Sequence, residues 1–403
     1  MYDRRISLEV YFMSEIKRDK ATLVFTGDIG FDRYMEGKWD DEELLSEEVL
    51  AFLHSADHVI ANVEGPLVDQ ASNTTTEGVQ QLMHTMNPAA IKVLQKMKAD
   101  IWNICNNHIM DAGEMGMKCT LEQAEKYGVK TIGAGMNLKE AKKPLILPDA
   151  GGIGMFGVGY QRGCKPAGEE KAGCLNWADM ETIQNVINEI KKTCRWCVIV
   201  SHGGEEFTSL PTPYTRDRYL EYLKMGADVV VCHHPHVPMN YETFDKKAIF
   251  YSLGNFIFDT DYQRAQFNTD IGLLLKLRFT EENFSFEPFG IKIERGPEHV
   301  VQGEIPRIFE DVQEEEYLKL EPLAAKMFIS ATKRQQIYLN PAEYANASEE
   351  KWKENFSNPR RSGRVIGEAL DFAIVCPLAE KEKEKEWKNS KLENVKNYIL
   401  EQI

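Results

Sequence analysis

Short apolar strands that end in a polar side chain recur along this sequence, and this feature restricts the possible folds most strongly. Strand-like runs at residues 21–27, 58–64, 101–105, 195–201 and 228–232 are separated by amphipathic stretches with helical spacing. This alternation is typical of an α/β domain whose sheet is largely parallel or mixed. Because loops at the carboxyl ends of strands form a common crevice in open α/β sheets, the polar residues there are expected to meet.

The residues at these strand ends are of the types that bind metal ions. They are Asp28, Glu64, Asn107 with its neighbour His108, His202, His234 and His236. Carboxylate and amide oxygens combined with imidazole nitrogens suit Mn²⁺, Fe or Zn²⁺. A carboxylate that bridges two such ions is chemically natural, since paired ions can activate water and also hold a leaving group. We therefore predict a site for one or two divalent ions.

Taken singly, most of these residues have a simpler interpretation. Asp28 alone would be a turn residue or a helix N-cap, and His202 alone a hydrogen-bonded, half-buried histidine. The pair His234 and His236 is stronger, because strand-like spacing would direct both rings to one side while Pro235 stiffens the backbone. His84 has no partner in sequence and is left out of the predicted site. The complete set carries the prediction.

The character of the sequence changes near residue 300. Sheet is expected at 248–258 and at 271–279, where apolar residues alternate along one face. Farther on, mixed charges and an apolar spacing at Leu392, Val395 and Ile399 predict helices. The predicted domains are an N-terminal extension (1–20, with Met1 or Met13 as the start), a main domain (21–298) and a mainly helical C-terminal appendage (299–403).

Charge and composition restrict the partners and the location. The net charge of -15 argues against nucleic-acid binding, because phosphate groups require a basic surface. With no run of about 18 apolar residues, neither a membrane segment nor a signal peptide is expected. The eight cysteines lack a disulfide framework spacing and favour a reducing cytoplasm. An oligomer is left open.

Six motifs follow one another in the order seen in CapA-type poly-γ-glutamate capsule-synthesis proteins. They are TGDIGFDR at 26–33, NVEGPL at 62–67, NNHIMDAG at 106–113, HGGEEF at 202–207, GADVVVCHHPHV at 226–237 and YSLGNFIF at 251–258. The chain resembles that family over roughly residues 22–279. The family in turn resembles the calcineurin-like metallophosphoesterases, which implies a metallophosphoesterase-like β-sandwich flanked by helices in four layers, α-β-β-α.

The resemblance also implies roles for individual residues. Asn107, His202 and His234 would surround one ion, with Glu64 as the bridge, while Asp28 and His236 would hold the other. His108 resembles the histidine that donates a proton to the leaving group or stabilises the developing negative charge, and Asp111 would orient it. Supporting residues around the ligands would be Asn62, Glu206 and Asn255.

Three positions depart from the phosphoesterase pattern, and the first is Cys232, which replaces the glycine usual before the final histidine pair. Gly30 stands where that pattern has a histidine, so one metal position would lose a ligand. His233 occupies a variable place, where it would either supply a ligand or face solvent.

The leading functional hypothesis is a metal-dependent hydrolase that acts on poly-γ-glutamate or a related amide with metal-activated water. A phosphoesterase for a small phosphate or nucleotide is the second hypothesis. The third is a non-catalytic metal-binding partner in polymer synthesis or export. An anionic polymer would need local positive charge on this acidic chain, for which Arg33, Arg162 and Lys165 are candidates.

Overall fold

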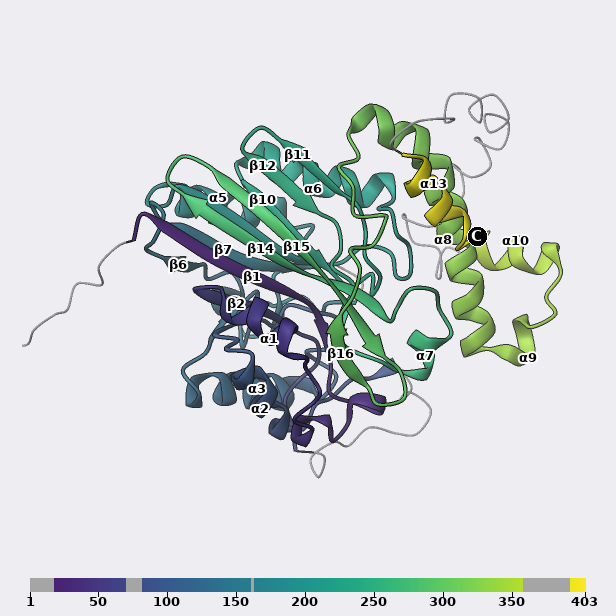
Figure 1. The fold of residues 1–403 in the computed structure, drawn as a ribbon, viewed down its shortest axis with the longest axis horizontal. Helices are drawn as coiled ribbons and strands as arrows, with labels where there is room; N and C mark the ends of the chain where they lie inside the picture. Colours follow the sequence, from purple (N-terminus) through teal and green to yellow (C-terminus); the bar gives the residue numbers. More distant parts are fainter. Residues whose placement is uncertain (1–17, 70–81, 161–162, 358–391) are drawn as a thin grey trace, which may run out of the picture.

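Two β-sheets packed face to face form the centre of the molecule, and helices cover both outer faces (Figure 1). The computed structural model describes residues 18–69, 82–160, 163–357 and 392–403. The predicted extension at 1–20 therefore lies outside the described residues, apart from its last three. The expected α-β-β-α layers and the helical C-terminal part are confirmed.

The larger sheet combines strands from both ends of the main domain. β1 to β4 run parallel to one another, and β14 to β16 extend the sheet in antiparallel fashion from β1. β13 adds a short parallel pairing at the end of β1, where Asp28 lies opposite Asn255. The strands are β1 (Lys20–Ile29), β2 (His58–Val63), β3 (Ile101–Asn103), β4 (Lys130–Ile132), β13 (Asn255–Ile257), β14 (Ile271–Thr280), β15 (Phe284–Glu294) and β16 (His299–Gln302).

The second sheet has a parallel centre with antiparallel edges. β12, β10, β9 and β7 are parallel neighbours, while β11 and β6 pair antiparallel at the two edges. A separate two-stranded ribbon is formed by β5 and β8. The bounds are β5 (Ala134–Gly135), β6 (Leu145–Leu147), β7 (Ile153–Gly159), β8 (Gly173–Cys174), β9 (Trp196–His202), β10 (Val229–His233), β11 (Tyr241–Phe244) and β12 (Lys247–Phe250).

The space between the sheets is filled by alternate residues of their strands. Leu273, Leu275, Leu277 and Phe279 of β14 are all fully buried in this core, as the alternation in the sequence predicts. Each such side chain contributes roughly 1.5–3 kcal/mol when it leaves water. The core therefore holds the two sheets, and the strand ends that they carry, in a fixed relation.

Amphipathic helices cover the outer faces of the sandwich. α1 (Glu47–His54), α2 (Ile91–Lys96) and α3 (Gly113–Lys126) pack on the larger sheet, and α5 (Met180–Lys191) and α6 (Pro213–Met225) pack on the second. α6 ends at Gly226, whose φ of 118° favours glycine. None of the described helices combines the length and apolarity needed to cross a bilayer.

The C-terminal part is helical and packs on one end of the sandwich (Figure 1). Its helices are α8 (Glu314–Leu339), α9 (Pro341–Tyr344), α10 (Glu349–Ser357) and α13 (Glu393–Leu400). Leu392, Val395 and Ile399 are buried against α8, as their spacing predicts. β16 begins just beyond the boundary expected at residue 298 and pairs in the larger sheet. The division into domains stays a prediction.

A buried arginine anchors the start of α8. Arg216 on α6 donates from Nε and Nη2 to the two carboxylate oxygens of Glu242, over 2.6 and 2.8 Å. Its Nη2 also donates to Glu314 at the first position of α8, over 2.6 Å. The hydroxyl of Tyr251 donates to Glu242 over 2.7 Å, and the guanidinium lies over the ring of Tyr317. The described acceptors and donors of this cluster therefore satisfy one another.

Candidate metal centre

The carboxyl ends of strands from both sheets converge on one buried cluster of polar side chains. Asp28 lies near the end of β1, Glu64 directly follows β2, and His202 is the last residue of β9. Asn107 follows β3, and His234 and His236 follow β10. Parallel strands present these ends at the same edge of their sheets, which explains why residues so distant in sequence meet.

Glu64 lies at the centre of the cluster. Its Oε1 is 3.7 Å from Nε2 of both His202 and His236, and 3.9 Å from Nε2 of His108. The side chain is fully buried, and burial together with the nearby charge of Asp28 raises the pKa of Glu64 well above its ordinary value. Neither of its oxygens has a hydrogen-bond partner among the described residues.

Asp28 and His236 are held by asparagines. Asp28 Oδ1 accepts from Asn62 Nδ2 over 2.8 Å, while Oδ2 lies 3.2 Å from His236 Nδ1. Asn255 Nδ2 donates to the Thr269 carbonyl, so its Oδ1 faces His236 Nδ1 at 2.9 Å. This arrangement directs Nε2 of His236 towards Glu64. Burial acts to lower the pKa of His236, but the charges of Glu64 and Asp28 raise it to about 10.

Asn107 links the other histidines. Its Oδ1 accepts from His202 Nε2 over 2.7 Å, and its Nδ2 lies 2.8 Å from His108 Nε2. Burial, helped by the neighbouring His234, lowers the pKa of His202 well below its ordinary value. His202 is therefore neutral, which is the form that binds metal ions.

His234 and His236 lie beyond the end of β10 and have positive φ values of 98° and 60°. The expected strand conformation is therefore wrong, because the backbone turns after His233, but both rings still reach the same site, with possible ligand atoms within 4.8 Å of one another and of Glu64. The ring centroids lie 6.0 Å apart. Nδ1 of His234 is buried without a hydrogen-bond partner among the described residues.

The donor set fits a cation. Two overlapping groups, Glu64 with His234 and His236, and Asp28 with Glu64 and His202, each bring their possible ligand atoms within 4.8 Å of one another. Three of the four carboxylate oxygens of Asp28 and Glu64 have no hydrogen-bond partner in the described part of the chain. Glu64 belongs to both groups, which agrees with its expected bridging position, although the histidines divide differently from the predicted pairing.

A comparison with known families matches residues 22–260 to the family described as bacterial capsule synthesis protein PGA_cap. The chain belongs to this family. The PGA biosynthesis protein CapA of Bacillus subtilis (strain 168) is 31% identical over 252 residues, which cover 62% of this chain and 66% of that protein. The capsule biosynthesis protein CapA of Bacillus anthracis is 25% identical over 258 residues, 62% of each chain. The match thus spans less than two thirds of the length of either relative.

This member of the PGA_cap family places a second histidine beside His108. Nδ1 of His108 is 2.7 Å from Asp111 Oδ2, as expected, and the backbone N–H of His84 donates to the same oxygen over 2.9 Å. The two imidazole rings lie 4.3 Å apart at 90°, and His84 Nδ1 is 2.7 Å from Asp32 Oδ2. Burial, with a further contribution from His84, lowers the pKa of His108 to about 4.

Sequence reasoning missed His84 because nothing in the spacing connects it to the other histidines. The backbone pairing of Val68 with Met86 brings it back to the end of β2. Gly65, with a φ of 112°, allows the close approach, because a Cβ there would lie 2.7 Å from the His84 carbonyl oxygen. The NVEGPL motif therefore contained a signal, since only a glycine fits this contact.

Two of the departures from the phosphoesterase pattern, Gly30 and His233, have physical explanations. At Gly30, a Cβ would lie 2.7 Å from the ring of Phe258, so this ring occupies the space beside the glycine. His233 is buried, and its Nε2 lies 2.8 Å from the Thr26 carbonyl oxygen. It does not face solvent, contrary to one of the two expectations, and it belongs to neither group of possible ligands.

Proposed function

We propose that this chain is a metal-dependent hydrolase of the capsule-biosynthesis type, which cleaves poly-γ-glutamate or a related amide with an activated water molecule. The proposal is carried by the buried carboxylates of Asp28 and Glu64, most of whose oxygens have no hydrogen-bond partner among the described residues. Membership of a capsule-synthesis family, with relatives named as PGA and capsule biosynthesis proteins, supports the substrate class. The cytoplasmic location stays a prediction.

One or two ions of Mn²⁺, Fe or Zn²⁺ would be held by the six strand-end residues. These are Asp28, Glu64, Asn107, His202, His234 and His236. A bound divalent cation would supply Lewis-acid polarisation of the amide carbonyl and lower the pKa of a water molecule. Asn62 and Asn255 support this function by fixing the orientation of Asp28 and His236.

His108 is the proposed proton carrier. Its hydrogen bond to Asp111 fixes the ring so that Nε2 faces Glu64 at 3.9 Å. Because burial keeps its pKa near 4, the ring is neutral at pH 7. In the proposed reaction it takes a proton from the attacking water and passes that proton to the departing amine.

The test combines metal analysis with hydrolysis assays. The purified chain is titrated with Mn²⁺ and Zn²⁺, and cleavage is then measured on poly-γ-glutamate and on a generic phosphodiester. We expect cation binding and metal-dependent cleavage of the polymer, both lost in His236→Ala. A protein that binds neither ion would contradict the proposal at its foundation.

The other outcomes distinguish the remaining hypotheses. Cleavage of the phosphodiester alone would reassign the substrate to a phosphate ester. Stoichiometric cation binding without cleavage of either substrate would favour a non-catalytic partner in polymer synthesis or export. Cleavage that persists in His108→Ala at unchanged metal content would remove only the role of His108.

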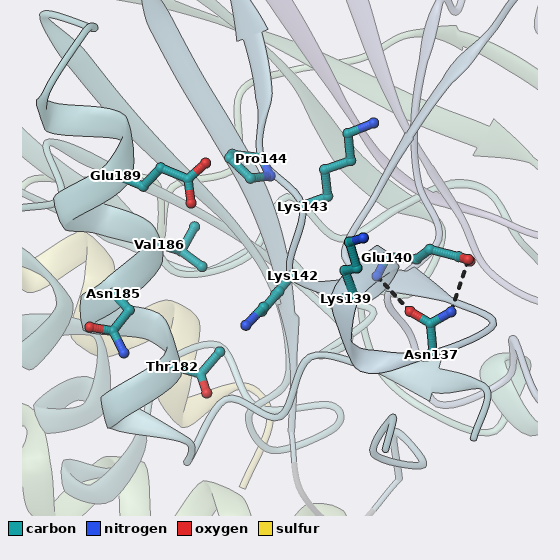
Figure 2. A pocket seen from close by; sticks show the side chains of 10 residues that line it. All are labelled: Asn137, Lys139, Glu140, Lys142, Lys143, Pro144, Thr182, Asn185, Val186 and Glu189. Carbon is teal, nitrogen blue, oxygen red and sulfur yellow. Dashed lines mark hydrogen bonds between the residues drawn. The ribbon is translucent and has the colours of Figure 1, made fainter. Parts of the chain in front are cut away.

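A lysine-lined pocket offers the positive charge that an anionic polymer needs on a chain of net charge -15. It lies between α4 (Leu138–Ala141) and α5, has a volume of about 610 Å³, and is lined by Lys139, Lys142 and Lys143 (Figure 2). Glu140 accepts hydrogen bonds from Asn137 Nδ2 and from the backbone, and no described carboxylate pairs with the lysines. Glu189, which also lines the pocket, only partly offsets their charge.

Of the cations proposed earlier, Arg33 lies 3.8 Å from Asp32 and Lys165 is exposed, while Arg162 lies outside the described residues. We expect the triple change Lys139→Gln, Lys142→Gln and Lys143→Gln to weaken poly-γ-glutamate binding by about 5-fold or more, less so at high salt. Lys118→Gln on α3, another exposed lysine, is the control. Equal binding by both variants would remove the pocket from the proposal.

A further inference from the structure

Two consecutive glutamates after β9 point to different surroundings. Glu205 is buried, and its Oε1 accepts from the hydroxyls of Thr212 and Thr215, each over 2.8 Å, which attaches the loop to the start of α6. The backbone N–H of Phe207 donates to the Pro235 carbonyl, which attaches the same loop to the segment of His234 and His236. Glu206, between these two attachments, is thereby held beside His234.

The two oxygens of Glu206 have separate contacts. Oε2 accepts from the hydroxyl of Tyr262 over 3.2 Å and from Nε2 of Gln335 over 3.1 Å. Oε1 lies 3.9 Å from Nε2 of His234. Because both donors to Oε2 are neutral, they fix the carboxylate without neutralising its charge.

His234 has the complementary arrangement. Its Nδ1 is buried without a hydrogen-bond partner among the described residues, and the residue belongs to the group with Glu64 and His236. Histidines that bind metals usually donate their other ring N–H to a carboxylate, which fixes the tautomer and the ring orientation. At 3.9 Å, Glu206 Oε1 is beyond hydrogen-bond distance of Nε2, but its negative charge favours a proton on that nitrogen and leaves Nδ1 as the metal-binding atom.

We propose that Gln335, on the C-terminal helix α8, is a positioning residue for the metal centre, which acts through Glu206 on His234. The inference rests on the metal site of the proposed function. Gln335 lies outside residues 22–260 that match the family, so the C-terminal part of this chain adds a contact to a site whose candidate metal ligands all lie within that match. α8 thereby contributes a residue that contacts the surroundings of the metal ligands.

The docking of α8 does not depend on the Gln335 amide. Tyr317, Leu320 and Met327 are buried in the cluster that joins α8 to α13, and Arg216 bonds to Glu314 at its first residue. Nearer the site, Ala331 packs with Phe207 and Val237. Loss of one hydrogen bond at Gln335 therefore leaves the helix attached, and a variant there tests position instead of folding.

The decisive experiment measures cation affinity, which does not require any catalytic activity. Calorimetric titration of the full chain with Mn²⁺ and with Zn²⁺ is compared for wild type, Gln335→Leu and Gln336→Leu. The control residue is adjacent on the same helix, and its side chain bonds only to Asn340 in the described structure. Since residues that support metal ligands typically change affinity 10–100-fold, we expect Glu206→Gln to fall in that range and Gln335→Leu to lose about 3–10-fold. Gln336→Leu is expected to bind as wild type does.

A double-mutant cycle separates positioning from a general effect on the fold. If Gln335 acts through Glu206, then Gln335→Leu has no further effect on affinity in the Glu206→Gln background. An unchanged affinity in Gln335→Leu, or a loss of the same size in both backgrounds, overturns the inference while leaving the proposed function intact. A wild-type chain that binds neither ion overturns both.

Discussion

Two buried clusters of charged residues in this molecule are built in opposite ways. At the start of α8, both oxygens of Glu242 accept from the Arg216 guanidinium, and the hydroxyl of Tyr251 adds a further donor. At the strand ends, the carboxylates of Asp28 and Glu64 together accept a single hydrogen bond from the described residues, and Asn62 donates it to Asp28. The buried carboxylate of the first cluster has hydrogen-bond partners for both oxygens, whereas most carboxylate oxygens of the second have none among the described residues.

The difference supports the proposal that the first cluster stabilises the fold and the second binds a cation. A buried charge is strongly unfavourable unless opposite charge or hydrogen bonds compensate it. Arg216 and Glu242 provide that compensation for each other within the chain. His236, whose pKa these two carboxylates raise, compensates Asp28 and Glu64 only in part, and we propose that a bound cation supplies the rest.

Disrupting the Arg216–Glu242 cluster should have the largest effect on the stability of the fold. Arg216→Met leaves Glu242 buried without its charged partner, and we expect the free energy of unfolding to fall by about 3–5 kcal/mol. Chemical denaturation measures this loss, and cation affinity should stay close to that of wild type. A loss below about 1 kcal/mol would show that the comparison overstates the role of the arginine.

A substitution in the strand-end cluster of Asp28 and Glu64 should impair cation binding and leave the fold intact. Glu64→Gln removes the carboxylate common to both groups of ligands. We expect the rate of polymer hydrolysis to fall at least about 100-fold, because several kcal/mol of transition-state stabilisation are lost. In chelator, the same variant should unfold at equal or higher denaturant concentration, because a neutral amide replaces a buried charge. Marked destabilisation in chelator would show that Glu64 has a structural partner after all.

A smaller effect is expected from the residue that orients His236. Asn255→Leu removes the acceptor at Nδ1 and should lower cation affinity about 10–100-fold, as changes next to metal-binding histidines do. Gln263→Leu serves as its control, because Gln263 accepts from the Asn255 amide but does not contact His236. Calorimetry that finds equal losses in both variants would attribute the effect to disturbed packing.

The smallest effect concerns a partly buried ion pair that belongs to neither cluster. The hydrogen bond from His58 Nδ1 to Asp100, over 2.6 Å, raises the pKa of His58 above its ordinary 6.5, with burial and Arg18 opposing and Asp57 assisting. Its contribution is fully present below the unfolded-state pKa and is lost as pH rises through the raised folded-state pKa. The difference in unfolding free energy between wild type and His58→Gln should therefore be larger near about pH 6 than near about pH 9. It should stay below about 1 kcal/mol, and a pH-independent difference would contradict the assignment.

The strand ends could be predicted from the sequence because apolar runs and polar termini are local patterns. Asp28, Glu64 and His202 follow from such runs, and the alternation in β14 indicates which face is buried. Residues that reach the site from loops or helices distant from these strand ends could not be found in this way. His84 reaches the site through a loop pairing, and Gln335 reaches it through the docking of a helix encoded far downstream. Such contacts depend on tertiary packing, which leaves no periodic signal.

The placement of β1 has a consequence for how the chain must fold during synthesis. β1 pairs with β2 early in the sequence, but its antiparallel neighbour is β14, with Leu23 opposite Leu277. Contacts between such distant segments slow folding, and a strand that lacks its neighbour exposes an unpaired edge. The edge of β1 that pairs with β14 therefore stays unpaired while the ribosome translates the middle of the chain. During that time it must be shielded, because it could otherwise pair with another nascent chain. A product that ends before residue 271 should aggregate through this edge instead of forming a smaller sandwich.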